Sequence, residues 1–297
     1  MKKRIGIVLV ALLVVATGWY FFVNPSDYTV NFKVKTSVGA VNQTLKLWHT
    51  SLEDGKSLTQ ESLGSLEQVR QFGDSTHVYR WYMTKENDSV VKVRMRVRDE
   101  ANSLANRWSV ITGGSGFVAR AKASGSEFFE VMTTHLEKTK VTIDGEAETP
   151  ETYYAYVTEK GLQSHKAGGM MKNFNFVTGL MLRNGVTQKG SPFIEVLKWD
   201  QETDSIEYNF CFPILRSENL PQHPNVKYGK RYAKKALKAT YNGNYITSDR
   251  AWYALQEYAE RNNIEIVPEP LEVFFNNPQM GGNEEEWRTD VYMPIKE

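Results

Sequence analysis

The second half of the chain repeats itself, and this repeat limits the folds that the sequence can adopt. The segment GLQSHKAGGM at 161–170 aligns with ALKATYNGNY at 236–245 at a constant offset of 75 residues, so that Leu162 pairs with Leu237. Each copy continues into a helical pattern, then a strand, a polar hairpin and a last strand that closes with Pro-Ile. Repeats of this kind are typical of a supersecondary unit that buries its apolar face against its neighbour. The pattern predicts two tandem βαββ units with a cleft where they meet.

The first 25 residues differ in composition from the rest of the chain. Lys2, Lys3 and Arg4 precede an uncharged run of 19 residues at 5–23. At about 1.5 Å rise per residue a helix of this length spans ~28 Å, which is enough for the hydrocarbon core of a bilayer. The run is longer than the apolar core of a usual signal peptide, and the aromatic stretch at 19–22 suits a membrane interface. The sequence favours an uncleaved single-pass anchor, with a cleaved signal as the alternative.

The charges around this run indicate how it would insert. Cations lie before it, and the next charged residue after it is Asp27, so the positive-inside rule places the N-terminus in the cytoplasm. The soluble remainder is then expected to be extracytoplasmic (periplasmic). The net charge of the whole chain is only +1, and no nucleic-acid partner is expected.

Residues 26–145 are expected to form the first folded unit. The segment YTVNFKVKT at 28–36 alternates as a strand does, and a helical pattern follows it. Three more strand patterns lie between 65 and 97, and the segment 124–141 has the periodicity of a long amphipathic helix. This order resembles the START-like (SRPBCC, polyketide cyclase-like) helix-grip fold. The resemblance implies an apolar cavity for a lipid or another hydrophobic molecule.

A change of composition marks the expected boundary between the two halves. The segment VTIDGEAETPET at 141–152 is acidic, contains proline and has no large apolar residue after Ile143. We therefore expect a mixed α+β protein in three parts. These parts are a membrane anchor or signal at 1–25, the START-like unit at 26–145 and a second unit at 146–297.

Residue types that usually perform catalysis or hold metals are sparse. The five histidines are scattered without a partner at the spacing of a metal site, so no metal or other cofactor is expected. The single cysteine, Cys211, lies in an apolar strand pattern, which predicts a buried and unreactive thiol. No motif supplies an activated nucleophile, and the sequence therefore indicates no catalytic residue.

Residues 152–297 resemble the GyrI-like domain, the effector-binding half of certain multidrug-responsive bacterial regulators. The resemblance rests on YNGNYITSDRAWYALQEYAERNNIEIVPEPLEVFFNNP at 241–278, on EEEWRTDVYMPI at 284–295 and on the doubled architecture. It implies two SHS2-type βαββ units related by a pseudo-two-fold axis. In the regulators this domain is joined to a DNA-binding helix-turn-helix, whereas here the apolar run and the START-like segment take that place.

The resemblance also implies a ligand site. In the family the last strand carries an acid at the floor of an aromatic pocket, where it pairs with cationic and often planar ligands. Asp290 in WRTDVYMPI takes this position, where Glu is usual, so its carboxylate would lie about one methylene further back. A shielded acid attracts a cation strongly, and each aromatic face adds about 0.5–2 kcal/mol. The alternative is a surface acid paired with Arg288.

Aromatic residues near the expected cleft are the candidate walls of this pocket, although packing in the core is the alternative for each. They are Tyr292, Trp287, Tyr245, Phe274 and Tyr208.

These features favour a membrane-anchored, extracytoplasmic protein that binds a small cationic or amphipathic organic molecule. One alternative is a hydrolase that acts on electrophilic small molecules in the same cleft, with the acid as general base. A second is binding of a lipid by the START-like unit, and a third is a scaffold on which both units bind proteins. The sequence does not determine the oligomeric state.

Overall fold

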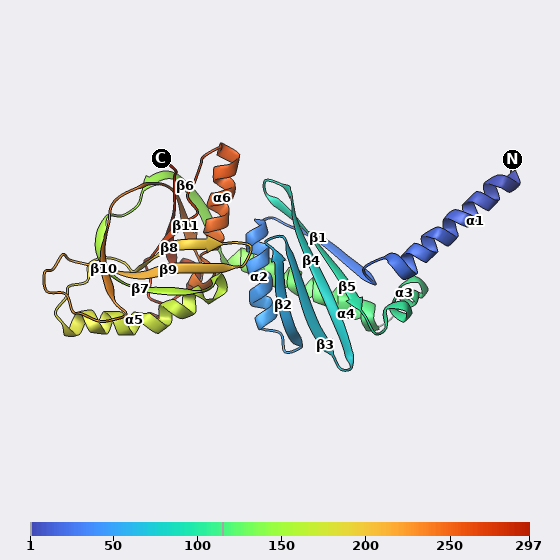
Figure 1. Cartoon of the computed structure of the whole chain (residues 1–297), viewed down its shortest axis with the longest axis horizontal. Coiled ribbons are helices and arrows are strands. Elements are labelled where there is room, and N and C mark those ends of the chain that lie inside the picture. Colours follow the sequence, from blue (N-terminus) through green and yellow to red (C-terminus); the bar gives the residue numbers. More distant parts are fainter. Residues whose placement is uncertain (1, 115) are drawn as a thin grey trace.

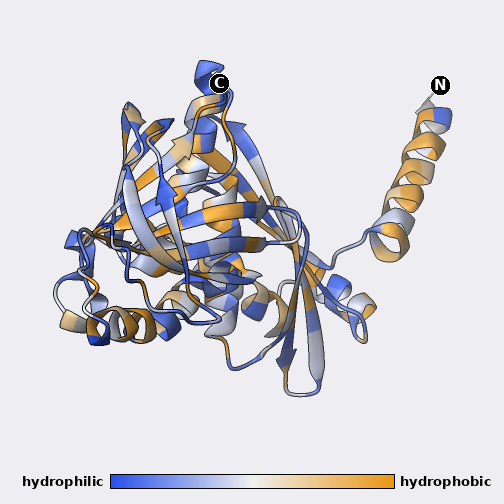
Figure 2. Ribbon diagram, turned by 60° about the vertical axis from the view of Figure 1, so that its left-hand side comes forward, coloured by the Kyte–Doolittle hydropathy of each residue, from blue (hydrophilic) through white to orange (hydrophobic). Residues whose placement is uncertain are grey.

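The uncharged N-terminal run forms a helix that projects from the rest of the chain in the computed structural model, which describes residues 2–114 and 116–297 (Figure 1). Helix α1 (Lys2–Gly18) continues into a π-helical turn, η1 (Trp19–Val23), and Figure 2 shows it as a nearly continuous hydrophobic segment. The stretch Arg4–Val23 is long and apolar enough to cross a membrane, and its most apolar window is entirely unburied. A membrane anchor and a signal sequence share these properties.

The first folded unit is an antiparallel sheet with helices packed on one face. Its strand order is β1-β5-β4-β3-β2, and alternate residues of the strands pack against α2 and α4. Trp48, Trp81 and Phe128 form the centre of this core, with ring centroids 5.0 to 5.9 Å apart. The elements are β1 (Tyr28–Val34), α2 (Val38–Thr50), β2 (Gly55–Ser62), β3 (Ser65–Phe72), β4 (Ser75–Asn87), β5 (Val90–Asp99), α3 (Ser103–Thr112) and α4 (Gly116–Lys138).

Three features of this unit differ from the expectation, and one of them is helix α3, which was not predicted. Strand β2 was not predicted because its sequence, GKSLTQES, is mostly polar, as suits an edge strand that is largely open to solvent. The long helix begins at Gly116 rather than near 124, because Phe117 and Ala121 on its first turns pack into the core.

The second folded unit is an eight-stranded antiparallel sheet with the order β10-β7-β9-β8-β12-β13-β11-β6. Helices α5 and α6 cover one face, where the largest apolar cluster lies, and a smaller cluster lies on the other face. The strands are β6 (Lys140–Glu148), β7 (Thr152–Leu162), β8 (Phe193–Asp200), β9 (Ser205–Ile214), β10 (Lys227–Arg231), β11 (Lys235–Asn242), β12 (Leu271–Phe274) and β13 (Arg288–Pro294). The helices are α5 (Lys166–Arg183) and α6 (Arg250–Asn262), with the short 3-10 turns η2 (Gln163–His165), η3 (Tyr245–Thr247), η4 (Pro278–Met280) and η5 (Glu284–Glu286).

Each half of this sheet contains a strand, a short turn, a helix and two further strands. The turn η2 begins at Gln163 and η3 begins at Tyr245, 82 residues later, rather than at the offset of 75 read from the sequence. Gly168 therefore lies inside α5, whereas Gly243 follows the last residue of β11 and has a φ of 144°. No single offset aligns the halves, because α5 has 18 residues and α6 has 13.

The boundary between the units lies earlier than the composition suggested. Strand β6 pairs with β11 along its whole length, from Lys140 opposite Asn242 to Glu148 opposite Lys235. Val141 and Ile143 pack against the core of the second sheet. Residues 140–145 thus belong to the second sheet, although they were expected in the first unit.

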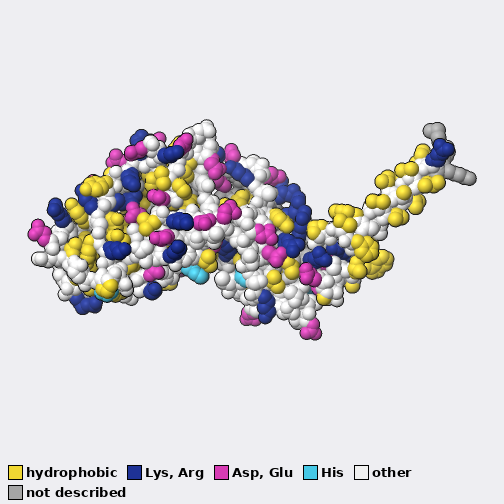
Figure 3. Space-filling model, viewed as in Figure 1, with side chains coloured by type: hydrophobic (Ala, Val, Ile, Leu, Met, Phe, Trp, Pro, Cys, Tyr) yellow, Lys and Arg dark blue, Asp and Glu magenta, His cyan; other side chains and the backbone are white. Residues whose placement is uncertain are grey.

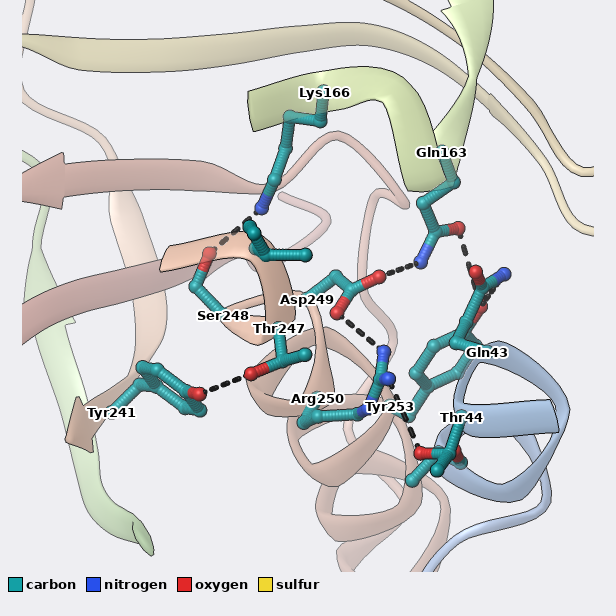
Figure 4. Close-up of polar contacts among 12 residues, drawn as sticks. Gln43, Thr44, Gln163, Lys166, Tyr241, Thr247, Ser248, Asp249, Arg250 and Tyr253 are labelled. Atoms are coloured by element: carbon teal, nitrogen blue, oxygen red, sulfur yellow. Dashed lines mark hydrogen bonds and ion pairs between the residues drawn. The ribbon is translucent and has the colours of Figure 1, made fainter. Parts of the chain in front are cut away.

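Polar side chains join the two units where α2 meets α6. A Cβ on Gly39 would lie 2.2 Å from the ring of Tyr253, so only glycine allows this approach. Gln43 donates to Asp204 Oδ1 at 2.5 Å. The guanidinium of Arg250 reaches Thr44 Oγ1 at 3.3 Å (Figure 4). Arg250 is also paired with Asp249 at 2.7 Å.

His135, near the end of α4, makes the fold sensitive to acid. Burial and the nearby Arg250 lower the pKa of its imidazole to about 4, and its Nε2 is buried without a hydrogen-bond partner. Between pH 6.5 and 4 the unfolded chain then binds a proton that the folded chain does not. We expect the free energy of unfolding to fall by about 2–3 kcal/mol over this range on account of His135. Urea unfolding of the full chain across this pH range measures the loss.

A comparison of variants isolates this contribution from those of other titrating groups. In His135→Gln the free energy of unfolding should depend less steeply on pH than in the parent. His165→Gln, at an exposed position on η2, should show the same pH dependence of the free energy of unfolding as the parent. Identical slopes for the parent and His135→Gln would contradict the prediction.

Candidate functional site

A cavity of about 510 Å³ lies between the two halves of the second sheet. Helix α5 contributes Met170 and Phe174, the turn η3 contributes Tyr245 and Ile246, and Phe274 comes from the end of β12. The loop 275–287, which connects β12 to β13, closes another side. Both halves of the doubled unit therefore build the cavity.

The inner wall of the cavity is aromatic. The ring of Tyr245 lies 4.9 Å from that of Phe274 and 5.4 Å from that of Trp287, between centroids. All three side chains are buried, while Phe275 and Ile246 are exposed at the rim. Contacts between the rings hold the buried three in place, so the wall presents preformed aromatic surface beside an open entrance.

Few polar groups face this surface. Burial raises the pKa of the Tyr245 hydroxyl to about 12, so it is neutral at pH 7. The Tyr245 hydroxyl accepts a hydrogen bond from the Asn276 amide at 2.7 Å and donates to the Arg288 carbonyl at 3.2 Å. Among the described lining residues, Glu284 on η5 is the one with a charged side chain. One acid thus lines the cavity, while the guanidinium of Arg288 lies 4.8 Å from the ring centroid of Phe275 at the rim.

A buried ion pair lies close in sequence to lining residues of the cavity, and Figure 4 shows the contact of its lysine, Lys166, with Ser248. Lys166, the first residue of α5, donates to both carboxylate oxygens of Glu272 at 2.7 and 2.9 Å and to Ser248 Oγ at 2.8 Å. Its ammonium also lies 4.8 Å from the centroid of the Trp252 ring. Burial raises the pKa of the Glu272 carboxyl, and the charge of Lys166 opposes that shift. The cluster ties the start of α5 to β12 and to the segment before α6.

Lys166 and Glu272 do not line the cavity, although each is within two residues of a lining residue in the sequence. Glu272 lies on the same face of β12 as Phe274, and Lys166 precedes the lining residue Ala167. Neither was a candidate from sequence. The available signal was an acid inside the apolar strand LEVFF, since a charge in such a strand is rarely buried without a partner.

The candidate residues divide into two groups in the structure. Tyr245, Phe274 and Trp287 line the cavity together. Tyr208, Asp290 and Tyr292 do not. Tyr208 is buried between β9 and α5, where its hydroxyl donates to the Lys166 carbonyl at 3.0 Å.

Asp290 lies on the opposite face of the sheet from the cavity. Successive residues of a strand point to opposite faces, so Val291 and Met293 pack on the helix side while Tyr292 joins the cluster on the other side. Asp290 is only 4% exposed and is paired with Arg288 at 2.8 Å and with Lys238 at 3.1 Å. Asp290 therefore does not line this cavity. The alternative pairing with Arg288 is present, with the carboxylate of Asp290 buried and the side chain of Arg288 48% exposed.

Cysteine and potential metal ligands are further candidates for chemistry in the part of the chain that the structure describes. The thiol of Cys211 is fully buried on β9, and burial raises its pKa, as expected for an unreactive cysteine. Within residues 2–114 and 116–297, no group of three or more His, Cys, Asp and Glu side chains is arranged to hold a metal ion.

The doubled sheet, the helices on one face and the cavity between the halves define a small-molecule-binding class of domain. The chain belongs to the GyrI-like family, since the family model described as the GyrI-like small molecule binding domain matches residues 146–296. None of the curated protein sequences compared with this chain matches it.

Several solved structures are similar to part of this chain. The crystal structure of the EcmrR C-terminal domain is 15% identical, with a TM-score of 0.44, and the match covers 54% of this chain and 98% of that one. The EcmrR–DNA complex is 12% identical, with a TM-score of 0.43, and covers 68% and 86%. The structure of SAV2435 bound to tetraphenylphosphonium is 10% identical, with a TM-score of 0.36, and covers 53% and 93%.

Proposed function

We propose that this protein is a membrane-anchored, extracytoplasmic receptor that binds a small cationic or amphipathic organic molecule in the cavity between the two halves of its GyrI-like domain. One observation carries the proposal. A cavity of about 510 Å³ has buried aromatic walls and an exposed rim, and Glu284 is the one charged side chain among its described lining residues. Ligand sites are commonly ~300–1,000 Å³, mostly apolar and largely preformed.

The aromatic wall supports a ligand with planar or ring-shaped apolar parts. Tyr245, Phe274 and Trp287 offer ring faces that can stack on such a ligand, and they also attract a cation above the ring. Phe275 and Met171 at the rim lengthen this surface towards solvent.

The single acid supports a preference for positive charge. Glu284, an exposed lining residue, takes the role that was expected of Asp290, and no lysine or arginine is among the described lining residues. A carboxylate at the entrance of an apolar cavity attracts a cation, although contact with water weakens this attraction. An anion of the same shape would meet repulsion instead.

Membrane attachment and the first unit belong to the same proposal. The unburied apolar stretch Arg4–Val23 supports an anchor, and the cations before it support an extracytoplasmic soluble part. The order of strand, helix, antiparallel strands and long helix supports a START-like first unit. The repeated strand–turn–helix–strand–strand order supports two SHS2-type units with a pseudo-two-fold relation.

Two alternatives have less support. Hydrolysis in the same cavity was expected to use Asp290 as general base, and this residue lies on the other face of the sheet. Lipid binding by the first unit needs space between the sheet and α4, where Trp48, Trp81 and Phe128 pack together.

Binding of a lipophilic cation to the full chain tests the proposal. The chain is reconstituted in lipid nanodiscs, tetraphenylphosphonium is titrated by equilibrium dialysis, and empty nanodiscs provide the background. We expect Trp287→Ala to weaken binding at least about tenfold, because it removes the largest ring of the wall. Tyr232→Ala, which removes an aromatic ring exposed outside the cavity, should leave the affinity unchanged.

The same assay tests the charge preference. Tetraphenylborate has nearly the shape of tetraphenylphosphonium and the opposite charge, so Glu284→Gln should weaken binding of the cation and strengthen binding of the anion. Glu285→Gln, its neighbour on η5, is the matched control. Cation binding no greater than to empty nanodiscs, or an unchanged affinity in Trp287→Ala, would overturn the receptor proposal.

A further inference from the structure

Helix α3 turns its apolar side chains to solvent. Leu104, Trp108 and Ile111 are 54, 62 and 59% exposed. Their spacing of four and three residues places them on one side of the helix. The charged residue of the helix, Arg107, is buried instead. This is the reverse of the usual arrangement on a soluble surface, and such contiguous exposed stripes commonly mark an interaction site.

Arg107 attaches α3 to the end of the N-terminal helix. Its guanidinium donates to the carbonyl oxygens of Tyr20, Phe21 and Asn24 at 2.6, 2.8 and 2.5 Å. It also forms an ion pair with the buried Asp27 at 2.8 Å. These carbonyls end the helical segment and would otherwise lack partners. The four contacts fix α3 at the point where the apolar run leaves the folded unit (Figure 1).

The apolar surface is continuous from the N-terminal helix to α3. The ring of Phe21 lies 6.3 Å from that of Trp108, between centroids. Trp19, Phe22 and Val23 on the last turn are exposed beside it. Figure 3 shows this hydrophobic surface running along the helix and onto the adjoining part of the folded unit. Whatever covers the end of the helix is therefore in position to cover the stripe on α3.

Charge on the neighbouring strand distinguishes between possible partners. Strand β5, which ends just before α3, carries Lys92, Arg94, Arg96 and Arg98 on its outer face. Arg94 bonds to an asparagine and Arg96 lies over a tyrosine ring, so neither charge is neutralised in these contacts. A second copy of the chain would bring the same positive charge against this surface. Anionic lipid headgroups complement it.

We propose that α3 lies in the boundary between headgroups and acyl chains of the membrane that holds α1, with Leu104, Trp108 and Ile111 directed towards the lipid. This inference rests on the proposed membrane attachment. An amphipathic helix with a tryptophan on its apolar side is typical of an interfacial segment. The chain would then meet the bilayer at two rigidly joined places, and Arg107 would set the orientation of the folded units relative to the membrane.

Site-directed fluorescence on the full chain tests this contact. The chain is reconstituted in vesicles of phosphatidylethanolamine and phosphatidylglycerol, and Ile111→Cys is labelled with an environment-sensitive dye. Cys211 is fully buried and does not compete for the label in the folded protein. We expect a nitroxide near the headgroup of the lipid to quench roughly half or more of the emission, and aqueous iodide less than about a tenth. Leu104→Cys provides a second position on the stripe.

Two reference labels separate this inference from the membrane attachment itself. Leu12→Cys on α1 should be quenched by the lipid nitroxide, and Ser89→Cys, at the far end of β5, by iodide. Iodide quenching at Leu104 and Ile111 with lipid quenching at Leu12 would overturn the interfacial position of α3 and retain the anchor. Iodide quenching at Leu12 would overturn both. Protection of the stripe from both quenchers would show a protein partner there and would also overturn the inference.

Discussion

Replacing Lys166 with methionine is expected to lower the free energy of unfolding of the GyrI-like domain by about 3–5 kcal/mol. The substitution leaves Glu272 fully buried and without its cation, with the hydrogen bond from Ser248 Oγ at 3.0 Å remaining. A carboxylate in this position must either stay charged in the interior or take up a proton, and both are unfavourable. Urea unfolding of the full chain, followed by near-ultraviolet circular dichroism, measures the change.

Two further variants distinguish the ion pair from a simple loss of packing. Lys172→Met removes a lysine from the exposed side of the same helix, where its contact to Glu159 is 3.5 Å, and should cost less than about 1 kcal/mol. The double variant Lys166→Met/Glu272→Leu should recover part of the loss, because no buried charge is left unpaired. A double variant at least as unstable as Lys166→Met would contradict the explanation.

Replacing Arg107 with methionine is expected to have an effect of similar size in the first unit, about 3–5 kcal/mol. The substitution leaves Asp27 buried with a hydrogen bond from Ser103 and one from the Asp99 amide but with no cation. It also leaves the carbonyls of Tyr20, Phe21 and Asn24 without their shared donor. Thermal unfolding of the full chain in nanodiscs gives the loss of stability.

Arg94→Met is the matched control for Arg107→Met. Arg94 lies on the outer face of β5 and makes a single hydrogen bond, to Asn31 at 3.2 Å, so its removal should change stability by less than about 1 kcal/mol. If the two variants were equally stable, the contacts of Arg107 would not be the connection between the apolar helix and the folded unit that we infer.

The buried polar groups of both units share one property. Lys166 with Glu272 and Arg107 with Asp27 each join segments that are far apart in the sequence, by 106 residues in the first pair and 80 in the second. Asp249 and Arg250 extend the first cluster to Gln163 and to Thr44 of the other unit (Figure 4). Such pairs restrict how the segments pack, because any other arrangement would leave a buried charge without a partner.

The elements with strong periodicity were predictable from sequence. Helices α2, α5 and α6, the strands β1, β3, β4 and β5 and the closing strand β13 follow patterns that are visible in the chain. Strands that lie at the edge of a sheet and therefore carry polar residues were not predictable from the sequence. Strand β2 is such a case, and the first part of β6 was assigned to the wrong unit because its partner, β11, lies about 95 residues further along the chain.

The aromatic part of the site was also predictable, and the acid was not. Tyr245, Phe274 and Trp287 were candidates, and they meet at the cavity. Position in a motif suggested Asp290, but strand alternation turns it to the other face, where Lys238 and Arg288 hold it. Glu284 lies in a run of three glutamates before β13, and only the path of the loop 275–287 brings this one to the cavity.

The sequence by itself determined the periodic elements, the apolar N-terminal helix and membership of the GyrI-like family, because these depend on spacing and composition along a short stretch of chain. The tertiary structure decided which face each side chain reaches, which acid lies beside the aromatic wall, and which cation neutralises each buried carboxylate. These outcomes depend on strand register and on the packing of segments that are often more than 100 residues apart, as are Lys166 and Glu272. A shift of one residue in a strand exchanges its two faces.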